Sequence, residues 1–340
     1  MEKNRIASQR IRIVKKWSCF LPMITKTPIL NREQWLEERK KSVGGSEIGA
    51  ILGMNPWQSA YSLWAERTGK VAAFEGNLQT KVGTYLEDLV AKLFEEESGF
   101  KVQRTNFIYR NDLYPALHAT PDRLLVGRKA GLECKTTSAL NAKKFRDAEF
   151  PAQYYAQAVQ YMAVTGLMEW FIAVLVGNNE FHIYHLTRIK DQPKTDFCEA
   201  SLYIEEGEIN TLAAAAEEWL QHVRDDTPPA IDGSDASRET LMTIYQEGVG
   251  GTVNLFGRER MLKRYEQLKE QIKALEEEKK QIENTICADL GDNYEGHTGQ
   301  YTVTWKPVSR TVFDTKACIK DHPEMAIYQR LSLSRQFRVR

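Results

Sequence analysis

The stretch HATPDRLLVGRKAGLECKTT, residues 118–137, decides the fold, because it predicts two short strands joined by the loop VGRKAG. On a strand, residues i and i+2 point to the same face, so Glu133 and Lys135 share one side and Cys134 takes the other. Asp122 lies just before the first strand, and the hairpin can bring it back beside Glu133. Two carboxylates and a lysine at the ends of paired strands indicate a place to hold a metal ion.

Magnesium suits this hairpin chemically. The carboxylates of Asp122 and Glu133, the main-chain carbonyl of Cys134 and a few waters are the hard oxygen ligands that Mg²⁺ prefers. An ion there can activate a water and stabilise the charge that develops on a phosphate, while Lys135 holds the water or offsets that charge. A structural Asp in a turn beside a Glu133–Lys135 salt bridge explains the same short pattern, so the hairpin alone leaves both explanations open.

Two predicted helices flank the hairpin and add polar residues at four-residue spacing. In the first, which ends at Gly99, Gly83 and Glu87 share a face beside an apolar stripe, so Glu87 adds a third carboxylate. Gly83, a costly residue inside a helix, lets the site be approached closely. In the second helix, AQYYAQAVQYMAVTG, Gln157 and Tyr161 share a face. Each pair taken alone also has a packing explanation.

Strands and helices alternate around these motifs. Strands are predicted within FKVQRTNFIY (100–109) and LYPALHA (113–119), and WFIAVLVGNNEFHIYHLTR (170–188) predicts two more strands that turn at GNNE. INTLAAAAEEWLQHV (209–223) predicts another helix. This order predicts a mixed sheet with helices packed on its faces, and therefore an α/β or α+β fold.

Taken in order, Gly83-x-x-x-Glu87, Pro121-Asp122, Glu133-Cys134-Lys135 and Gln157-x-x-x-Tyr161 resemble the PD-(D/E)xK nuclease core. The last motif is similar to that of its RecB-like branch. The segment GGSEIGAILGMNPWQSAYSLWAERTGK (44–70) resembles the signature of the YqaJ-like viral recombinases, the group that includes phage lambda-type alkaline exonuclease. The resemblance covers residues 31–225 and implies a restriction-endonuclease-like core, with a mixed central sheet flanked by helices.

The resemblance implies a Mg²⁺-dependent exonuclease, with two ions per site and Mn²⁺ as a substitute ion, that digests one strand of a DNA duplex 5′→3′. The remaining 3′-ended strand passes to a RecT- or Redβ-like annealing protein for recombination. By family match, Asp122 and Glu133 bind the metals, Lys135 acts on the attacking water, Glu87 supports the site, and Gln157 binds near the metals or the scissile strand. The family also implies a homo-oligomer, with a ring-shaped trimer as its known form.

A second site is indicated by QWLEERKKSVGGSEIG (34–49). Ser46 is predicted to cap a helix whose free N–H groups attract an anion, and Gly44-Gly45 allow the anion to approach. Arg39 offers a planar fork suited to phosphate. Trp35, Arg39 and Ser46 fall on the family's spacing for a 5′-phosphate pocket, and the resemblance places Tyr161 with the DNA-binding residues as well. An ordinary N-cap and a surface arginine are the competing explanation.

Two other functions fit the same fold. A structure- or end-specific endonuclease has the same core motifs, because fold does not determine function. A non-catalytic subunit that binds DNA ends is the third candidate, although a binder needs no trio of Asp122, Glu133 and Lys135. Covalently closed duplex separates the first two, because an exonuclease leaves it intact and an endonuclease cuts it.

Composition suggests four regions. A basic N-terminal arm (1–30) precedes an exonuclease domain (31–224), a linker rich in Pro, Asp, Gly and Ser (225–254) and a C-terminal module (255–340). In that module, a coiled-coil-like apolar stripe begins at Tyr265, and QYTVTWKPVSRTVFD (300–314) predicts a strand pair. We expect the hairpin around Trp305 to cover the stripe. Residues 1–41 contain eleven Lys or Arg and four Glu, a charge of +7 suited to a phosphate backbone or to a solvated tail.

Bulk composition narrows the class of protein. With 42% hydrophobic and 27% charged residues the chain is globular, and it contains no run of 18 apolar residues that predicts a membrane span. The N-terminus lacks the apolar segment of a secretory signal, so we expect the protein in the cytoplasm of a bacterial host, with a phage or prophage origin. Five scattered cysteines favour reduced thiols and argue against a zinc or iron–sulfur site.

Overall fold

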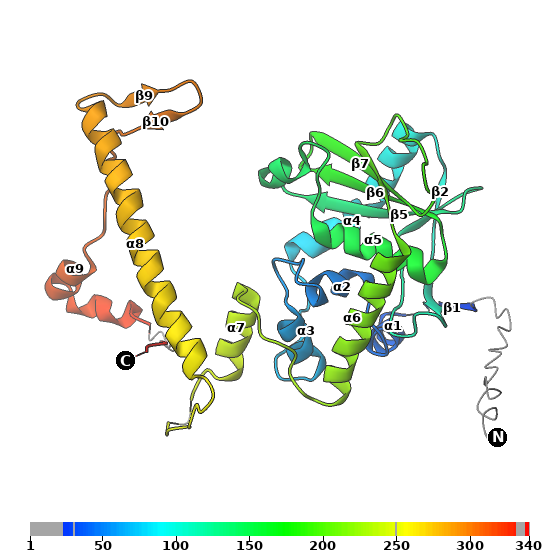
Figure 1. Ribbon diagram of the computed structural model, residues 1–340, viewed down its shortest axis with the longest axis horizontal. Helices are drawn as coiled ribbons and strands as arrows, with labels where there is room; N and C mark the ends of the chain where they lie inside the picture. The colour runs from blue at the N-terminus through cyan, green and yellow to red at the C-terminus, as the bar shows by residue number, and fades with distance from the viewer. Residues whose placement is uncertain (1–22, 30, 249, 331–336, 340) are drawn as a thin grey trace, which may run out of the picture. The chain divides into compact units, whose positions relative to one another are not determined.

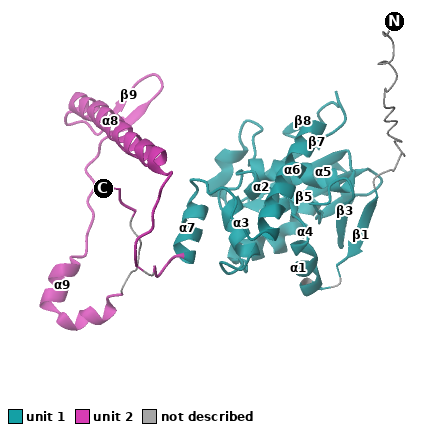
Figure 2. Ribbon diagram, turned by 60° about the horizontal axis from the view of Figure 1, so that its bottom comes forward, with its two compact units in different colours: residues 1–244 teal, residues 245–340 magenta. Residues whose placement is uncertain are grey.

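The computed structural model describes residues 23–29, 31–248, 250–330 and 337–339 of the chain. It divides into two compact units, residues 1–244 and residues 245–340, which Figure 2 colours separately. The basic arm predicted for residues 1–30 lies almost wholly outside the described residues. No helix in the described ranges is long and apolar enough to cross a membrane.

A six-stranded mixed sheet forms the centre of the first unit and confirms the predicted fold class. The strands lie in the order β2-β4-β5-β6-β7-β8. The β5–β6 and β7–β8 pairs are parallel and the other three pairs are antiparallel, so both predicted hairpins, β4–β5 and β6–β7, are confirmed. The strands are β2 Val102–Arg104, β4 Arg123–Leu125, β5 Ala130–Thr137, β6 Glu169–Val176, β7 Glu180–Thr187 and β8 Ala200–Tyr203.

Both faces of this sheet are covered, because alternate residues of β6 pack into two separate hydrophobic clusters. Trp170 and Ile172 belong to a cluster shared with α2, α3, α5 and α6, whereas Phe171 and Ala173 pack with Phe94 of α4. Figure 1 shows α5 and α4 in this central region of the first unit. The helices are α2 Gly45–Ile51, α3 Ala60–Arg67, α4 Leu78–Ser98, α5 Ala152–Thr165 and α6 Glu206–Arg224.

The strand predicted at residues 113–119 is wrong. Only isolated bridges occur there, because Pro115 has no amide hydrogen and the Leu117 amide donates at 2.9 Å to the Tyr114 carbonyl within a turn. The preceding strand β3 pairs instead with β1 in a separate two-stranded sheet. The remaining elements of this unit are β1 Ile24–Pro28, α1 Arg32–Lys40, β3 Phe107–Asn111, η1 Ala139–Phe145 and α7 Asp235–Ile244.

The segment predicted as a linker, residues 225–254, contains helix α7. Ser237 of α7 is 1% exposed, and its hydroxyl donates at 2.6 Å to the Asp232 carboxylate. The Ser59 hydroxyl, just before α3, lies 2.8 Å from the Ser237 hydroxyl and shares a hydrogen bond with it. The Asp and Ser residues that suggested a linker therefore form the start of a short packed helix, and the first unit ends at Ile244.

The second unit consists of one long helix, a short hairpin and two short helices. Only part of the predicted strand pair at 300–314 forms, because β10 pairs with the earlier strand β9. Trp305 is exposed, and the apolar stripe that begins at Tyr265 remains exposed, so the predicted self-burial of that stripe is wrong. The elements are α8 Glu259–Leu290, β9 Glu295–His297, β10 Thr302–Thr304, α9 Thr315–Asp321 and η2 Pro323–Tyr328.

Candidate active site

Three polar side chains meet between β5 and α5. Lys135 Nζ donates to Glu133 Oε1 at 2.8 Å and to Gln157 Oε1 at 2.9 Å. Gln157 Nε2 donates in turn to Glu133 Oε1 at 2.6 Å. Cys134, between the two β5 residues, packs instead with the cluster under α4. The alternation expected of a strand therefore places Glu133 and Lys135 on one face, with Gln157 of α5 as their common partner.

Asp122 reaches the same strand from the start of the hairpin. Its Oδ2 accepts a hydrogen bond from the Cys134 amide at 2.8 Å, so the hairpin brings the carboxylate back to β5 as expected. Glu133 is 3% exposed, and its second oxygen, Oε2, is buried without a hydrogen-bond partner among the described residues. A buried carboxylate oxygen without a donor is costly, which makes it an acceptor available to a cation.

The charged forms of the Asp122 and Glu133 carboxylates are disfavoured at this site. Burial and the charge of Glu133 raise the pKa of Asp122 well above its ordinary value, and burial likewise raises the pKa of Glu133. Burial alone would lower the pKa of Lys135, but the Glu133 and Asp122 carboxylates outweigh it and raise that pKa. Lys135 is therefore an ammonium ion. Its charge lies 5.3 Å from the ring of Tyr154, a neighbour that the sequence did not reveal.

Glu87 of α4 influences the pKa of Asp122 and Glu133, but its own carboxylate is already hydrogen-bonded to two arginines. Its negative charge contributes to the raised pKa of both Asp122 and Glu133. Its Oε1 accepts hydrogen bonds from Arg123 and, at 3.1 Å, from Arg104, neither of which was predicted to take part. The signal was local for Arg123, which follows Asp122 directly, whereas Arg104 comes from another strand. The arginines offset the charge of Glu87 at the edge of the site.

The close approach to the site predicted past Gly83 stays a prediction, and no protein neighbour among the described residues requires a glycine there. A Cβ added at Gly83 would lie 3.5 Å from Thr136 Oγ1, an ordinary contact. The glycine that is required lies in α2, where a Cβ at Gly45 would stand only 2.3 Å from Tyr161 Cε1 and 2.9 Å from Gln157 Cγ. Gly45 therefore lets α2 press against the two residues of the Gln-x-x-x-Tyr motif.

Tyr161 lies beneath the site rather than on its surface. It is 3% exposed, and its hydroxyl accepts a hydrogen bond from Gln157 Nε2 at 3.2 Å. Burial, with the charges of Glu133 and Asp122, raises the pKa of Tyr161. Its position supports Gln157 and joins α5 to α2, so the predicted contact of this side chain with DNA has no exposed surface to use.

Trp35, Arg39 and Ser46 come together as the sequence predicted. The Arg39 guanidinium carbon lies 4.5 Å from the centre of the Trp35 ring, and Nη2 donates to the exposed Ser46 hydroxyl at 3.4 Å. Nη2 is also 3.5 Å from the Glu47 carboxylate. The Arg39 guanidinium, which stacks on Trp35, and the exposed Ser46 hydroxyl are together suitable hydrogen-bond donors for a phosphate.

Ser46 does not cap α2, and the predicted free N–H groups are partly occupied. The N-cap is Gly44, whose amide donates at 2.7 Å to the carboxylate of Glu47. Burial opposes the charge on Glu47, but the Arg67 and Arg39 guanidiniums outweigh burial and keep its pKa below the ordinary value. The helix end therefore carries a carboxylate, and the positive charge in this region belongs to arginine side chains.

Further residues behind this site were not predicted. Arg110 Nη1 donates to the Ser42 hydroxyl at 2.7 Å, and that hydroxyl lies 2.9 Å from His118 Nδ1. Burial lowers the pKa of His118 to about 3, so the imidazole is neutral. Its Nε2 is buried without a partner among the described residues and would lie 3.1 Å from a Cβ at Gly44. These residues are far apart in sequence, and no local pattern connects them.

The residues at β5 fit a divalent cation, although they do not form a complete ligand cage. In the described ranges no group of three or more His, Cys, Asp or Glu residues is arranged to hold a metal. Asp122 and Glu133 supply two hard carboxylates, one of them with an oxygen that has no donor, and each raises the cost of ionising the other. A cation between them relieves both penalties, and water or substrate completes the coordination of ions such as Mg²⁺.

Comparison with known proteins supports the resemblance seen in the sequence. Residues 34–168 match the model of the YqaJ-like viral recombinase domain. The uncharacterised protein YqaJ of Bacillus subtilis (strain 168) is 36% identical over 322 residues, which cover 93% of this chain and 95% of that protein. The chain therefore belongs to the YqaJ-like viral recombinase family.

Two solved structures show a distant likeness. The alkaline exonuclease LHK-Exo from Laribacter hongkongensis is 15% identical with a TM-score of 0.45, covering 57% of this chain and 94% of that one. A phage-related exonuclease from Haemophilus somnus 129PT is also 15% identical, with a TM-score of 0.37, covering 54% of this chain and 96% of that one. At these scores family membership rests on the sequence matches.

Proposed function

We propose that the protein is a Mg²⁺-dependent nuclease that digests one strand of linear duplex DNA from its 5′ end. The observation that carries the proposal is the cluster of Asp122, Glu133, Lys135 and Gln157, in which the buried Glu133 Oε2 has no donor in the described part of the chain. A purely structural salt bridge would pair both oxygens of a buried glutamate. An open acceptor beside a second carboxylate and an ammonium ion suits a metal and a phosphate.

Asp122 and Glu133 would hold the ions, with the Cys134 carbonyl as a main-chain ligand. Bound there, Mg²⁺ or Mn²⁺ supplies a more acidic water and stabilises charge on the scissile phosphate, and two ions together would steady the attacking and leaving oxygens. Gln157 orients both Glu133 and Lys135, because its amide donates to one and accepts from the other. Glu87, which is hydrogen-bonded to Arg123 and Arg104, would contribute negative charge beside Asp122 and Glu133.

Lys135 would act as a donor in this site. The Glu133 and Asp122 carboxylates raise its pKa against the effect of burial, which favours the ammonium form over the free amine that a general base needs. It can instead donate a hydrogen bond to the attacking water or to a phosphate oxygen and offset the negative charge that develops there. The water must therefore lose its proton to another acceptor or to solvent.

Substitution of the carboxylates tests the metal site. We expect Asp122→Asn and Glu133→Gln each to lower cleavage by at least two to three orders of magnitude, on the scale of a lost electrostatic contact to the transition state. Glu96→Gln, on the exposed side of α4, is the matched control and should cleave at the wild-type rate. Retention of more than a tenth of the activity by Asp122→Asn would contradict the assignment.

Lys135→Ala separates binding from chemistry. We expect this variant to keep its affinity for Mg²⁺, measured by calorimetry, while the cleavage rate falls by about two orders of magnitude. The reason is that an ammonium ion repels a cation and cannot be its ligand, so Mg²⁺ binding should survive the loss of the Lys135 hydrogen bonds to Glu133 and Gln157. Loss of Mg²⁺ binding together with cleavage would make the lysine a structural residue.

Digestion in one direction requires that the enzyme bind one terminus of the strand. We propose that Arg39, Ser46 and Trp35 bind the 5′-phosphate. Charge-assisted hydrogen bonds contribute about 1.5–3 kcal/mol each. Arg39→Ala should therefore slow digestion of 5′-phosphorylated duplex by about one to two orders of magnitude. The same variant should lose much less on 5′-hydroxyl duplex. Equal losses on both substrates would mean that Arg39, which also contacts Glu47, serves the fold or general DNA affinity.

Two other functions and the binding partners can be tested with the same DNA substrates. Covalently closed duplex should stay intact, and cutting of that substrate would favour a structure- or end-specific endonuclease on the same core. Undegraded linear DNA would favour a non-catalytic DNA-end binder. The 3′ single-stranded tails suit a RecT- or Redβ-like annealing protein, and the family resemblance supports a homo-oligomer such as a ring-shaped trimer.

A further inference from the structure

The second unit does not bury a core of its own. Among its described residues Leu290 is the single buried side chain, and it packs where α8 meets the hairpin, with Cδ2 2.7 Å from the position of a Cβ at Gly296. The rest of α8, a helix of 32 residues, has no hydrophobic cover of this kind. Helices in water gain most of their stability from packing an apolar face. The remainder of α8 therefore needs a partner surface.

The apolar residues of α8 follow a heptad repeat from Met261 to Ile286, which we call the seam. Positions a and d recur at alternating steps of three and four residues, and the seam residues other than Lys279 are between 36% and 64% exposed. Phe337 contacts the first of the a residues with ring centres 5.4 Å apart. The a residues are Tyr265, Ile272, Lys279 and Ile286, and the d residues are Met261, Leu268, Leu275 and Ile282.

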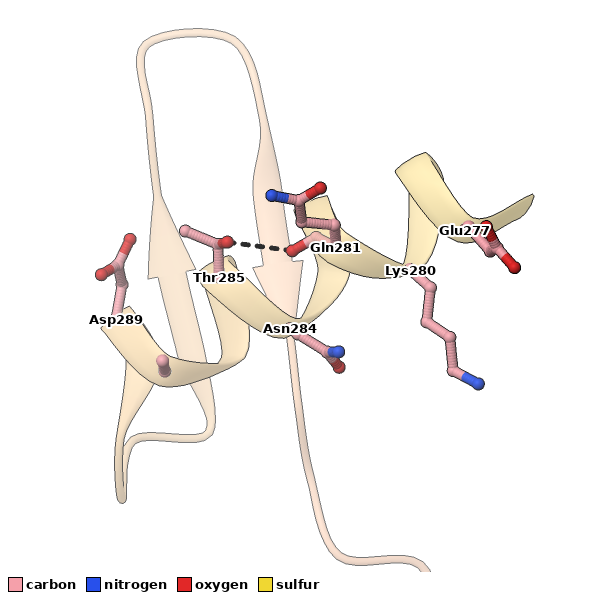
Figure 3. A pocket seen from close by; sticks show the side chains of 7 residues that line it. Glu277, Lys280, Gln281, Asn284, Thr285 and Asp289 are labelled. Carbon is pink, nitrogen blue, oxygen red and sulfur yellow. Dashed lines mark hydrogen bonds between the residues drawn. The ribbon is translucent and has the colours of Figure 1, made fainter. Parts of the chain in front are cut away.

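The opposite side of α8 is polar. Figure 3 shows this side, where a shallow hollow is lined by Glu277, Lys280, Gln281 and Asn284, and where the Thr285 hydroxyl donates to the Gln281 carbonyl at 2.9 Å. Lys273 and Glu277 also approach within 3.9 Å of one another along the helix. These polar side chains are stable in contact with solvent, so the seam is the face of α8 whose burial would stabilise the helix.

We propose that the seam pairs with the seam of a second copy of this chain, as an antiparallel two-stranded coiled coil. This goes beyond the proposed function, which concerns the first unit alone. One Lys at a single a position is a common device that restricts oligomer state and register. The charges along α8 indicate both the partner and its direction.

A parallel pair would place like charges together. Lys279 would face Lys279 of the second copy in the same core layer, where two ammonium ions would be desolvated side by side. At the flanking g and e positions, Arg264 would face Lys269 and Glu278 would face Glu283. Each of these flanking contacts occurs twice in a symmetric dimer, so the parallel homodimer is unfavourable.

An antiparallel pair removes these conflicts. With Ile272 opposite Leu275 of the second copy, every a residue from 265 to 286 meets a d residue, and Lys279 lies opposite Leu268. The two copies of Lys279 are then eleven residues apart along the axis, about 16 Å at 1.5 Å per residue, which exceeds the screening length in physiological salt. The stem of Lys279 covers Leu268 while its ammonium reaches Glu283 at 3.5 Å on its own helix.

Opposite charges also meet at the flanks of the antiparallel pair. In this register Lys269 of each copy lies beside Glu276 of the other, so the contact occurs twice. Two copies of the seam therefore repel each other when the helices are parallel and carry complementary charges when the helices are antiparallel. Self-complementarity of this kind is what a two-fold symmetric interface between identical chains requires.

Mass measurement on the full chain tests the pairing. We expect Leu275→Glu, in the central layer, to halve the mass of the assembly in multi-angle light scattering relative to wild type. Asn284→Glu adds the same charge on the polar side and should leave the mass unchanged. The factor of two applies where the seam is the only contact that joins the copies it pairs. Equal masses for Leu275→Glu and wild type would overturn the proposal.

Disulfide cross-linking tests the direction and does not depend on whether Leu275→Glu remains folded. In a full-length background with Ser at 19, 287 and 318, Met261→Cys and Ile286→Cys lie in one core layer only when the helices are antiparallel. A mixture of the two variants, one carrying a larger tag, should form the mixed disulfide under mild oxidation, and each variant alone should form none. Self-linked dimers of each variant, or no cross-link in the mixture, would overturn the antiparallel pair.

Discussion

The two units bury their hydrophobic residues in opposite ways. In the first, both faces of β6 are covered, so Trp170 and Phe171 on opposite sides of the strand are fully buried. In the second, Leu275 and Ile282 of α8 stand more than half exposed on a long helix. The proposed site, in which the charge of Glu133 acts on Asp122, needs a packed frame of the first kind, whereas an exposed repeating seam is typical of assembly. The first unit therefore has a packed core that can support the proposed site, and the second unit has an exposed face that suits the proposed pairing.

The largest effect on the packed unit should come from Gly45→Ala. The added Cβ would stand 2.3 Å from Tyr161, on a ring that packing holds in place, so α2 or α5 must move. Overpacking of this kind costs about 1–3 kcal/mol, and the loss should appear in urea unfolding followed by tryptophan fluorescence. Gly207→Ala in α6, where an added Cβ meets nothing within 4 Å, should be neutral or slightly stabilising. Equal stability of the two variants would show that α2 does not press on α5.

His118 should make the first unit sensitive to acid. Its pKa is lowered to about 3 in the folded state, so the folded chain keeps it neutral while the unfolded chain takes up a proton below about pH 6.5. Its stabilising contribution is therefore present above pH 6.5 and is lost as the pH falls toward 3, by up to about 1.4 kcal/mol per pH unit.

His118→Asn should flatten the fall in unfolding free energy between pH 6 and pH 4.5, measured by urea titration in EDTA. Parallel pH profiles for wild type and His118→Asn would show that the imidazole is protonated or hydrated in the folded protein.

The smallest effect should come from removing the second unit. A chain that ends at Ile244 keeps α7 and its Ser237–Ser59 hydrogen bond, so the unfolding free energy of the first unit should change by less than about 0.5 kcal/mol. A chain that ends at Arg224 lacks α7 and uncovers part of α3, and it should be less stable. A large loss already at Ile244 would mean that the second unit supports the first.

Much of the site followed from the sequence because its decisive contacts obey local rules. Strand alternation placed Glu133 and Lys135 together, and a helical step of four placed Gln157 above Tyr161. The hairpin returned Asp122 to the Cys134 amide. These predictions needed only periodicity, turn chemistry and the order of motifs along the chain, and so did the mixed sheet.

The remaining features depend on contacts between distant segments. Nothing near Glu47 indicates that Arg67 neutralises it, and so the cap of α2 was assigned to Ser46 rather than to Gly44. The close contact of Gly45 with Tyr161 was not predicted, because only tertiary packing shows which glycine faces a neighbouring ring. Local composition likewise could not distinguish a linker from the start of α7.

Digestion of an end-labelled linear duplex tests the central claim most directly. The full-length protein is incubated with Mg²⁺ and a duplex that carries one fluorophore near a 5′-phosphorylated terminus and a second near the 3′ terminus of the same strand. We expect the 5′ label to be released first, the 3′ label much later, and neither in EDTA or with Asp122→Asn. Release of the 3′ label first, internal cutting, or digestion that persists in EDTA would contradict a metal-dependent 5′→3′ exonuclease built on Asp122 and Glu133.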